Sequence, residues 1–284
     1  MDKTKLIRLS ILIGIILLGA FLWIHELGSL FQQGIGIILL IVTGLWLLSL
    51  AVKDASIIDI FWGPGFVITA WFYASQIGFD TLGSRNWVLL TLITVWGLRL
   101  GTYLAIRNLP KGEDYRYARW REDNGKNWWW LSFIRVFVLQ GFLLWIISSV
   151  YLPALSVQGE LTVLDYAGIA LWLTGFVFEA VGDWQLRQFK NNPDNKGKVM
   201  NQGLWRYTRH PNYFGDATLW WGYFLFGLAY PQGLIFIFCP IVMNFFLVKI
   251  SGVAMLESDL KKSKPKYKEY IEKTSAFIPM PPKE

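Results

Sequence analysis

Long apolar segments are the feature of this sequence that most restricts its fold. Crossing the hydrocarbon core of a bilayer takes about 20 helical residues. Eight stretches reach or nearly reach that length, and they lie near residues 6–24, 34–52, 57–75, 87–107, 129–152, 163–186, 213–230 and 233–252. Hydrophobic residues make up 54% of the 284, more than a soluble domain of this length needs. The sequence therefore predicts an all-α, polytopic transmembrane helical bundle.

The distribution of basic residues predicts how the bundle is oriented. Lys and Arg concentrate at the N-terminus, at Lys53, in the loops 107–126 and 187–209, and from residue 249 onward. With eight spans, all of these segments lie on one side, and by the positive-inside rule that side is cytoplasmic, with both termini. The net charge of +7 is thereby explained by the membrane surface, so no nucleic-acid partner is expected.

Two site classes are disfavoured by composition and motifs. The chain has one Cys and two His, His25 and His210, which argues against a zinc site, and no metal is expected. The dinucleotide fingerprint G-x-G-x-x-G and the Walker A pattern are both absent from the sequence. A nucleotide cofactor would therefore be held by the helical bundle and not by a Rossmann domain.

Three polar residues recur every four positions in the segment 87–107. Arg99, Tyr103 and Arg107 therefore share one face of the expected helix. Arg107 can reach the headgroups, but Arg99 lies about 12 Å deeper at 1.5 Å per residue. A charge at that depth usually faces a partner or a polar cavity, although snorkelling is the alternative.

A second polar stripe ends the segment 163–186. Glu179, Asp183 and Arg187 follow one another at four-residue spacing, and Lys190 lies one turn further on. An intrahelical ladder of ion pairs would explain the spacing without a function. Two acids at the membrane boundary, next to basic loops, favour a polar cavity instead.

The stretch 201–221 concentrates the remaining polar chemistry. Pro211 suits the first turn of a helix, which makes His210 its cap and places Asn212 and Asp216 on its first turns. Helix N-termini attract anions, and Arg206 and Arg209 precede this one. We expect an anion site here.

An acidic residue also lies early in the segment 57–75. Asp59 precedes Gly63-Pro64-Gly65, which should kink or open the helix and so line a cavity. Asp59 is therefore a candidate acid.

The C-terminal stretch 256–273 mixes apolar residues with lysines, and Pro265 should break it in two. Two interpretations stay open: a cationic helix on anionic lipid, or a lid over a cytoplasmic cavity. We divide the chain into an N-terminal transmembrane hairpin, 1–52, and a catalytic domain, 53–284.

Several motifs in correct order carry a family resemblance. They are EAVGDWQLRQFK, GLWRYTRHPNYFGD, SGVAMLES and KYKEYIEKTSAFIPMPP. Over roughly residues 50–282 the chain resembles the bacterial membrane-reductase relatives of steroid 5α-reductase, the domain of unknown function 1295. The resemblance implies an NADPH-dependent reductase in the bacterial inner membrane, with its cofactor site facing the cytoplasm. It implies reduction of a carbon–carbon double bond conjugated to a carbonyl in a lipophilic, steroid- or isoprenoid-like substrate.

The resemblance also assigns residues. Asn212 and Asp216 would hold the nicotinamide end of the cofactor, and Asp59 would polarise the substrate carbonyl, for which it must be protonated. The further cofactor-binding positions implied are Arg99, Arg107, Glu179, Asp183, Arg187, Lys190, Arg209, His210 and Tyr213. Two positions depart from the family pattern: Glu179 replaces an Asn, and Trp96 stands where a catalytic Tyr is expected, with Tyr103 as the nearest alternative. Asp59, Tyr103 and Asp216 are thus the candidate catalytic residues.

Two competing functions stay open. The pattern R-H-P-x-Y-x-G with the later Glu257 is also similar to isoprenylcysteine and phospholipid methyltransferases, which use S-adenosylmethionine. A non-catalytic lipid-binding or transport bundle is the third possibility. In every case the expected partners are membrane lipid and a lipophilic small molecule, and the sequence predicts no oligomeric state.

Overall fold

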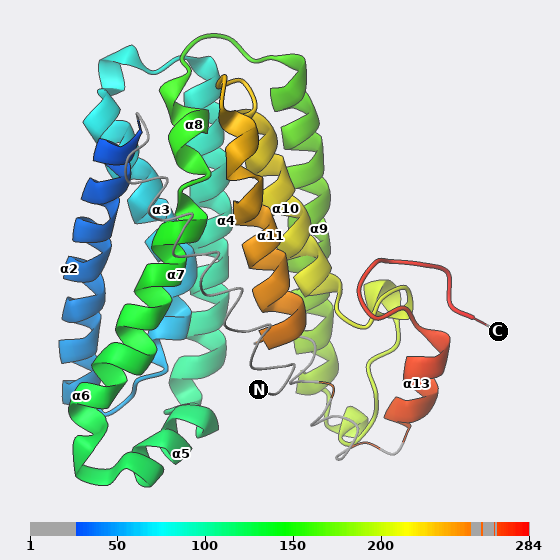
Figure 1. Ribbon diagram of the computed structural model, residues 1–284. Helices are drawn as coiled ribbons and strands as arrows, with labels where there is room; N and C mark the ends of the chain where they lie inside the picture. The colour runs from blue at the N-terminus through cyan, green and yellow to red at the C-terminus, as the bar shows by residue number, and fades with distance from the viewer. Residues whose placement is uncertain (1–26, 251–256, 258–263, 265, 284) are drawn as a thin grey trace, which may run out of the picture. The chain divides into compact units, whose positions relative to one another are not determined.

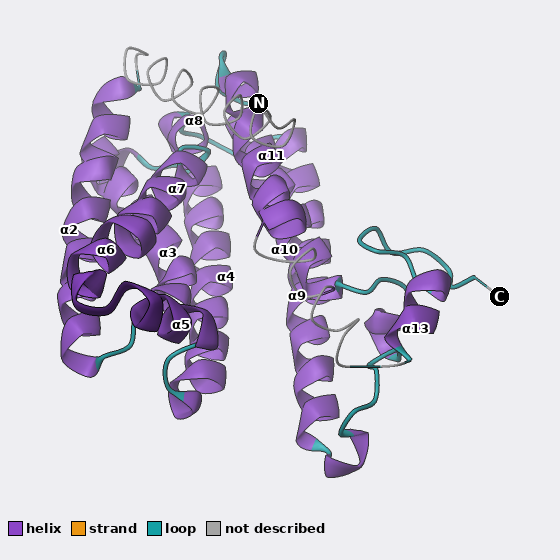
Figure 2. Cartoon of the chain, turned by 60° about the horizontal axis from the view of Figure 1, so that its bottom comes forward, coloured by secondary structure: helices purple, strands orange, loops and turns teal. Residues whose placement is uncertain are grey.

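The computed structural model describes residues 27–250, 257, 264 and 266–283, and every regular element among them is helical (Figures 1 and 2). The predicted all-α class is therefore confirmed. The chain forms two compact units, Met1–Glu160 and Leu161–Glu284, and each is described by itself. The expected division after residue 52 stays a prediction. The segment expected at 6–24 lies outside the described residues.

The first unit is built mainly from four long helical runs joined by short turns. Its elements are α2 (Gly28–Val52), α3 (Ile57–Ile77), η1 (Phe79–Thr81), α4 (Ser84–Asn108), η2 (Leu109–Lys111), α5 (Tyr115–Asn124), η3 (Gly125–Asn127), α6 (Trp128–Ser132), the π-helical η4 (Phe133–Val138), α7 (Leu139–Ser148) and α8 (Tyr151–Ser156). The helix α3 is central, because it contacts α2, α4, α7 and α8.

The second unit is dominated by two long helices. Its elements are α9 (Val163–Asn191), η5 (Pro193–Asn195), η6 (Gly203–Arg206), α10 (Pro211–Gly227), η7 (Gly233–Ile237), α11 (Phe238–Phe245), the π-helical η8 (Phe246–Ile250) and α13 (Tyr267–Lys273). As predicted, His210 is the N-cap residue of α10 and Pro211 its first helical residue.

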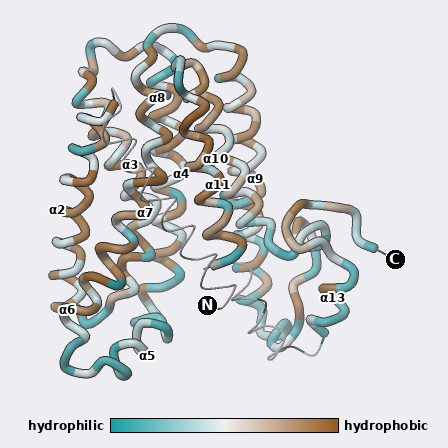
Figure 3. Tube along the Cα trace, in the orientation of Figure 1, coloured by the Kyte–Doolittle hydropathy of each residue, from teal (hydrophilic) through white to brown (hydrophobic). Residues whose placement is uncertain are grey.

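Five helices in the described part of the chain are long and apolar enough to cross a membrane. They are Gly28–Val52, Ile57–Ile77, Ser84–Lys111, Tyr115–Ser148 and Val163–Asn191. Apolar residues run along these helices, whereas α5, at the start of the fourth, is largely hydrophilic (Figure 3). The protein is therefore an integral membrane protein.

Two predicted spans end earlier than expected, and the end of a third lies outside the described residues. The segment 213–230 corresponds to α10, which has 17 residues, and the segment 233–252 to the apolar run Gly233–Lys249. The helix expected at 129–152 stops at Ser148. The count of eight spans and the cytoplasmic termini stay predictions.

Glycines allow α3 and α4 to approach closely. A Cβ at Gly63 would lie 2.2 Å from the carbonyl oxygen of Gly97, and one at Gly101 would lie 2.7 Å from the ring of Pro64. The helix α3 also continues through Pro64 as one α-helix. Of the expected kink or opening at Gly63-Pro64-Gly65, the opening is therefore wrong and the kink stays a prediction; the glycine before the proline serves helix packing.

A buried arginine caps α8. Arg85 is 1% exposed, and its guanidinium donates to the carbonyl oxygens of Ala154 and Val157 at 3.0 and 2.7 Å. The side-chain amide of Asn86 donates to the carbonyl of Leu155 at 3.1 Å. These donors satisfy carbonyls that the end of a helix leaves open.

In the second unit, α9 and α10 lie side by side and run antiparallel (Figure 1), and they meet along a seam of glycines. The seam consists of Gly168, Gly175 and Gly182 on α9 and of Gly215 and Gly222 on α10. A Cβ at Gly175 would lie 2.5 Å from the carbonyl oxygen of Gly215, and one at Gly222 would lie 2.6 Å from that of Gly168. The seven-residue spacing on both helices therefore brings their backbones into contact, as in small-residue packing between membrane helices.

The loop between η6 and α10 is tied to the C-terminal segment. Thr208 Oγ1 donates to the carbonyl of Phe277 at 2.8 Å, and the Met280 amide donates to the carbonyl of Tyr207 at 2.9 Å. The Tyr270 hydroxyl donates to the carbonyl of Trp205. The end of the chain therefore packs on the loop that leads into α10.

Candidate active site

In the first unit, Asp59 is the centre of a polar network at the start of α3. Arg116 Nη2 donates to its Oδ2 at 3.0 Å, and the Tyr117 hydroxyl donates to its Oδ1 at 2.7 Å. Both carboxylate oxygens therefore accept hydrogen bonds. The sequence interpretation needed a protonated Asp59 that donates, whereas Asp59 is an acceptor in this structure.

The network continues from Tyr117 to α7. Gln140 Nε2 donates to the Tyr117 hydroxyl at 3.1 Å, and Trp62 Nε1 donates to Gln140 Oε1 at 2.6 Å. The Tyr117 side chain is buried, with 5% of the residue exposed. The phenol of Tyr117 thus makes a tyrosine–carboxylate pair with Asp59, and sequence reasoning missed it. The signal available in the sequence was that Tyr117 follows Arg116 in a basic loop, together with the candidate acid Asp59.

Contacts at the start of α5 hold Tyr117 in place. Asp114 caps α5 by accepting from the amide of Arg116 at 3.0 Å. Glu113 accepts from the amide of Ala55 at 2.7 Å and receives two hydrogen bonds from Arg121. Burial opposes ionisation of Asp114, but the hydrogen bonds from Arg116 prevail and lower its pKa below its usual value. These contacts fasten α5 against the beginning of α3.

The predicted stripe on α4 has the expected one-sided arrangement. The guanidinium of Arg99 lies 6.0 Å from the centre of the Tyr103 ring, and that of Arg107 lies 5.4 Å from it. Arg99 and Tyr103 are half-buried, and Arg107 is exposed. Trp96, one turn earlier, is fully buried and packs against Phe66, with ring centres 5.8 Å apart. A core residue thus stands where the family pattern places a tyrosine.

In the second unit, four predicted residues gather beside the glycine seam. Asn212 Nδ2 donates to Asp183 Oδ1 at 3.1 Å, and Trp220 Nε1 donates to Asp216 Oδ1 at 3.1 Å. Glu179, Asp183 and Asp216 are each less than a tenth exposed. The site is therefore a buried group of three acids and one amide on facing turns of α9 and α10.

The amide of Asn212 is only half satisfied. Its Oδ1 atom is buried, and within the described residues it accepts no hydrogen bond. A buried amide oxygen without a donor is costly and uncommon. It is suited to receive a donor from a bound molecule.

Arg209 and His210 bind a residue that follows the last apolar segment. Arg209 Nε donates to Glu257 Oε1 at 2.8 Å, and its Nη1 donates to the carbonyls of Ile271 and Thr274 at 3.2 and 2.6 Å. His210 Nε2 lies 3.2 Å from the same Glu257 oxygen. Arg209 is 7% exposed, and its donors are directed at protein atoms. This geometry favours a structural role for Arg209, where the sequence analysis expected a cofactor contact.

The remaining predicted residues lie at the edges of this region. Tyr213 stacks on His210, with ring centres 5.7 Å apart. Arg187 and Lys190 are exposed near the end of α9. The structure thus places Asp59 with Tyr117, which was not predicted, and Arg99 with Tyr103 and Arg107 in the first unit. In the second unit it places Asp183 with Asn212 and Arg209 with His210.

The contacts of Glu257 should make the folded protein less stable as the pH falls into the acid range. Burial works against ionisation, but hydrogen bonds from His210 and Arg209 prevail and lower the pKa of Glu257 from 4.5 to about 2. A carboxyl whose folded pKa is depressed stabilises the fold above its unfolded pKa, and this stabilisation is lost as pH falls through the folded value. We expect the unfolding midpoint of the wild type to drop between about pH 4.5 and pH 2.

Thermal unfolding of detergent-solubilised variants across this pH range checks the expectation. Glu257→Gln should unfold earlier at neutral pH and lose part of the acid dependence, because its amide cannot ionise. Glu269→Gln is the matched control, since Glu269 is 63% exposed and pairs only with the neighbouring Lys273 among the described residues. An acid dependence of Glu257→Gln equal to that of the wild type would contradict the assignment.

Comparison with known proteins places the chain in a family. The family model described as "Protein of unknown function (DUF1295)" matches residues 45–274. The fold defines the chain as an integral membrane protein built from helices. The chain belongs to the DUF1295 family, as the sequence motifs indicated. No solved structure matches the chain.

Three relatives show the range of the similarity. An uncharacterized protein of Schizosaccharomyces pombe is 26% identical over 86% of this chain and 79% of its own length. Human 3-oxo-5-alpha-steroid 4-dehydrogenase 1 is 34% identical over 32% of this chain and 36% of its own. A probable O-methyltransferase of Ustilaginoidea virens is 33% identical over 32% of this chain and 31% of its own. The chain thus matches about a third of the length of each named enzyme.

Proposed function

We propose that the protein is an integral membrane reductase that uses NADPH to reduce a carbon–carbon double bond conjugated to a carbonyl in a lipophilic substrate. The observation that carries the proposal is the buried Tyr117–Asp59 pair at the start of a membrane-spanning helix. Similarity to steroid dehydrogenases supports the same reaction class. The experiment described below tests the cofactor.

The second unit supplies groups suited to the cofactor. A nicotinamide carboxamide offers an N–H donor, and the buried Oδ1 of Asn212 is an acceptor without a donor among the described residues. Asp183 fixes the Asn212 side chain by accepting from its Nδ2 at 3.1 Å. We assign Asn212 to the carboxamide and Asp183 and Asp216 to the polar wall around it. The cofactor, when bound, would supply a hydride to the β-carbon of the enone, and a proton from water would complete the reduction at the α-carbon.

The first unit supplies a group suited to the substrate. Reduction of an enone places negative charge on its carbonyl oxygen, and a preorganised donor at that oxygen lowers the barrier. Tyr117 Oη–H is the neutral donor of the Asp59 network, and Arg116 adds positive charge beside it. We assign the donor role to Tyr117, whose single O–H must turn from Asp59 Oδ1 to the substrate oxygen, and we assign Asp59 the role of holding Tyr117 and Arg116 in place until the substrate binds. This proposal replaces Tyr103 as the candidate phenol.

The methyltransferase alternative predicts a different role for the acid after the last apolar segment. S-adenosylmethionine carries an ammonium group that such an acid would bind. In this structure Glu257 already binds Arg209 and His210. The reductase is therefore the function that the contacts favour, and the methyltransferase becomes an outcome of the test.

Asn212→Ala is expected to weaken NADPH binding at least about tenfold, since the variant removes the acceptor Oδ1 and its hydrogen bond to Asp183. Thermal shift of the purified protein in detergent, titrated with NADPH and with S-adenosylmethionine, measures the binding. Asn191→Ala, at the exposed end of α9, is the control and should bind as the wild type does.

Each outcome of this titration decides between functions. A shift with NADPH that Asn212→Ala loses supports the reductase and the assigned residue. A shift with S-adenosylmethionine alone would show that the reductase proposal is wrong. An unchanged NADPH affinity in Asn212→Ala would remove Asn212 from the cofactor site. Equal midpoints of the variants without ligand establish that each one is folded.

A further inference from the structure

The second unit contains a cavity of about 480 Å³ outside the group of acids on α9 and α10. It lies between the loop after α9, the helix α13 and the C-terminal segment. Five of its lining residues are basic and one is acidic: Lys198, Arg206, Lys266, Lys273 and Lys283, with Glu269. Five positive charges less one negative charge leave four positive charges around one small cavity.

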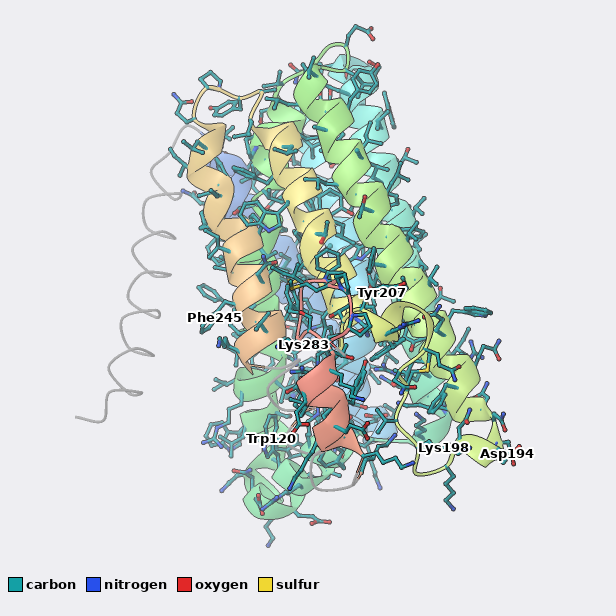
Figure 4. The ribbon with its side chains drawn as sticks, turned by 90° about the vertical axis from the view of Figure 1, so that its right-hand side faces the viewer. Trp120, Asp194, Lys198, Tyr207, Phe245 and Lys283 are labelled. Carbon is teal, nitrogen blue, oxygen red and sulfur yellow. The ribbon has the colours of Figure 1, made fainter. Side chains whose placement is uncertain are left out.

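The basic residues come from three separate segments of the chain. Lys198 and Lys283, both labelled in Figure 4, belong to the loop after α9 and to the C-terminal segment. Lys266 is the N-cap residue of α13 and Lys273 is its last residue, two helical turns later, so both lie on one side of this helix. The amide of Lys283 donates to the carbonyl of Lys273 at 2.8 Å, which holds the last residues against that helix. The fold thus brings together basic side chains that lie far apart in the sequence.

Few acids neutralise these cations. Lys273 pairs with Glu269 at 3.3 Å. In the part of the chain that the structure describes, Lys198, Arg206, Lys266 and Lys283 form no ion pair. Like charges that converge around a cavity repel one another, and a bound anion relieves the repulsion. The cavity is therefore suited to a ligand with several negative charges.

Size and charge indicate the ligand class. Cavities of roughly 300–1,000 Å³ typically hold small molecules, so a polymer is not required. A phosphate monoester carries about −1.5 to −2 charges at neutral pH, so a ligand with two or three phosphate groups matches the four positive charges. Val199, Tyr270 and Pro282 add apolar surface beside the cations, which suits a nucleotide base.

One residue connects this cavity to the acids and amide on α9 and α10. Tyr270 lines the cavity and donates to the carbonyl of Trp205. Trp205 Nε1 in turn donates to the carbonyl of Gly182 at 3.0 Å. A Cβ at Gly182 would lie 3.2 Å from the amide nitrogen of Asn212. The cavity wall and the turn that carries Asn212 are thus parts of one packed region.

We propose that this cavity is a phosphate-ester site that binds the phosphorylated adenosine end of the nucleotide cofactor. The identity of the ligand rests on the proposed function, whereas the phosphate chemistry does not. An anionic lipid headgroup presents the same chemistry, and the experiment distinguishes the two sources. On this proposal α13 walls a binding cavity, which is closer to the lid interpretation of the C-terminal stretch than to a helix lying on lipid.

A pair of double variants with equal charge changes tests the site. Lys198→Gln/Lys266→Gln removes two cavity cations. Lys196→Gln/Lys268→Gln removes two exposed cations from the same loop and the same helix, and neither residue lines the cavity. The probe is adenosine 2′,5′-bisphosphate, titrated calorimetrically into the full chain in detergent. Because this probe has no nicotinamide, its binding is independent of hydride transfer.

We expect the cavity variant to bind the probe at least about tenfold more weakly than the wild type, and the control to bind as the wild type does. Equal affinities of the two variants would overturn the proposal. In a second arm, nanodiscs of phosphatidylglycerol and of phosphatidylcholine are compared by thermal unfolding. A stabilisation by phosphatidylglycerol that only the cavity variant loses, with unaltered probe binding, would overturn the nucleotide assignment and identify a lipid headgroup as the phosphate source.

Discussion

Replacing Tyr117 with Phe should lower kcat for enone reduction by about 10²–10³-fold, which is the usual cost of removing one donor from a developing oxyanion. The substitution removes only the hydroxyl that donates to Asp59 at 2.7 Å and keeps the buried ring. NADPH affinity should change little, because the residues assigned to the cofactor all belong to the second unit. The measurement is NADPH oxidation in the presence of a lipophilic enone that the wild type reduces.

Tyr103→Phe is the decisive comparison for this prediction. Tyr103 was the phenol that the sequence suggested, and its ring lies beside the guanidinium groups of Arg99 and Arg107. If Tyr103→Phe loses activity and Tyr117→Phe keeps it, the assignment of the donor is reversed. If both retain wild-type kcat, neither phenol polarises the substrate.

Replacing Gly215 with Ala should destabilise the second unit by roughly 1–3 kcal/mol or more, as overpacking does. The added Cβ would lie 2.4 Å from the amide nitrogen of Glu179 and from the carbonyl oxygen of Gly175, so α9 and α10 must separate. Helix propensity alone would predict a gain of about 1 kcal/mol for the same change. The steric cost of the added methyl group should therefore exceed the gain in helix propensity, so the variant should be less stable than the wild type.

Thermal unfolding and size-exclusion profiles in detergent check the Gly215 prediction. Gly44→Ala is the matched control, because a Cβ at Gly44 on α2 meets nothing within 4 Å among the described residues. The control should unfold at or above the wild-type temperature. A Gly215→Ala protein as stable as Gly44→Ala would show that the glycine seam tolerates a methyl group.

The helices could be predicted because their signal is local. Apolar length predicted the positions of α2, α3, α4 and α9, and the proline rule predicted the start of α10 at Pro211. The glycine seam was equally present in the sequence, as residues spaced by seven on two segments. It was missed because glycine contributes little to hydropathy, and its meaning depends on which helix lies opposite.

The site could be predicted only in part because its contacts are remote in sequence. Asp59 and Tyr117 are 58 residues apart, and their contact depends on how Glu113 and Asp114 anchor α5. Arg209 was predicted to bind a cofactor from its charge and from the nearby helix start. Its partner Glu257 belongs to the motif SGVAMLES, but the motif does not show that this carboxylate pairs with Arg209.

The seven-residue spacing of the seam limits how the second unit can move. The closest backbone approaches occur where a glycine of one helix faces the main chain of the other, so sliding by one or two residues would bring side chains into these contacts. The next permitted register is a full seven residues away, about 10.5 Å along the helix axis. Asp183 and Asn212 are therefore held at a constant offset by main-chain contact. We therefore expect ligand entry in this unit to depend on the loops and the C-terminal segment more than on sliding of α9 along α10.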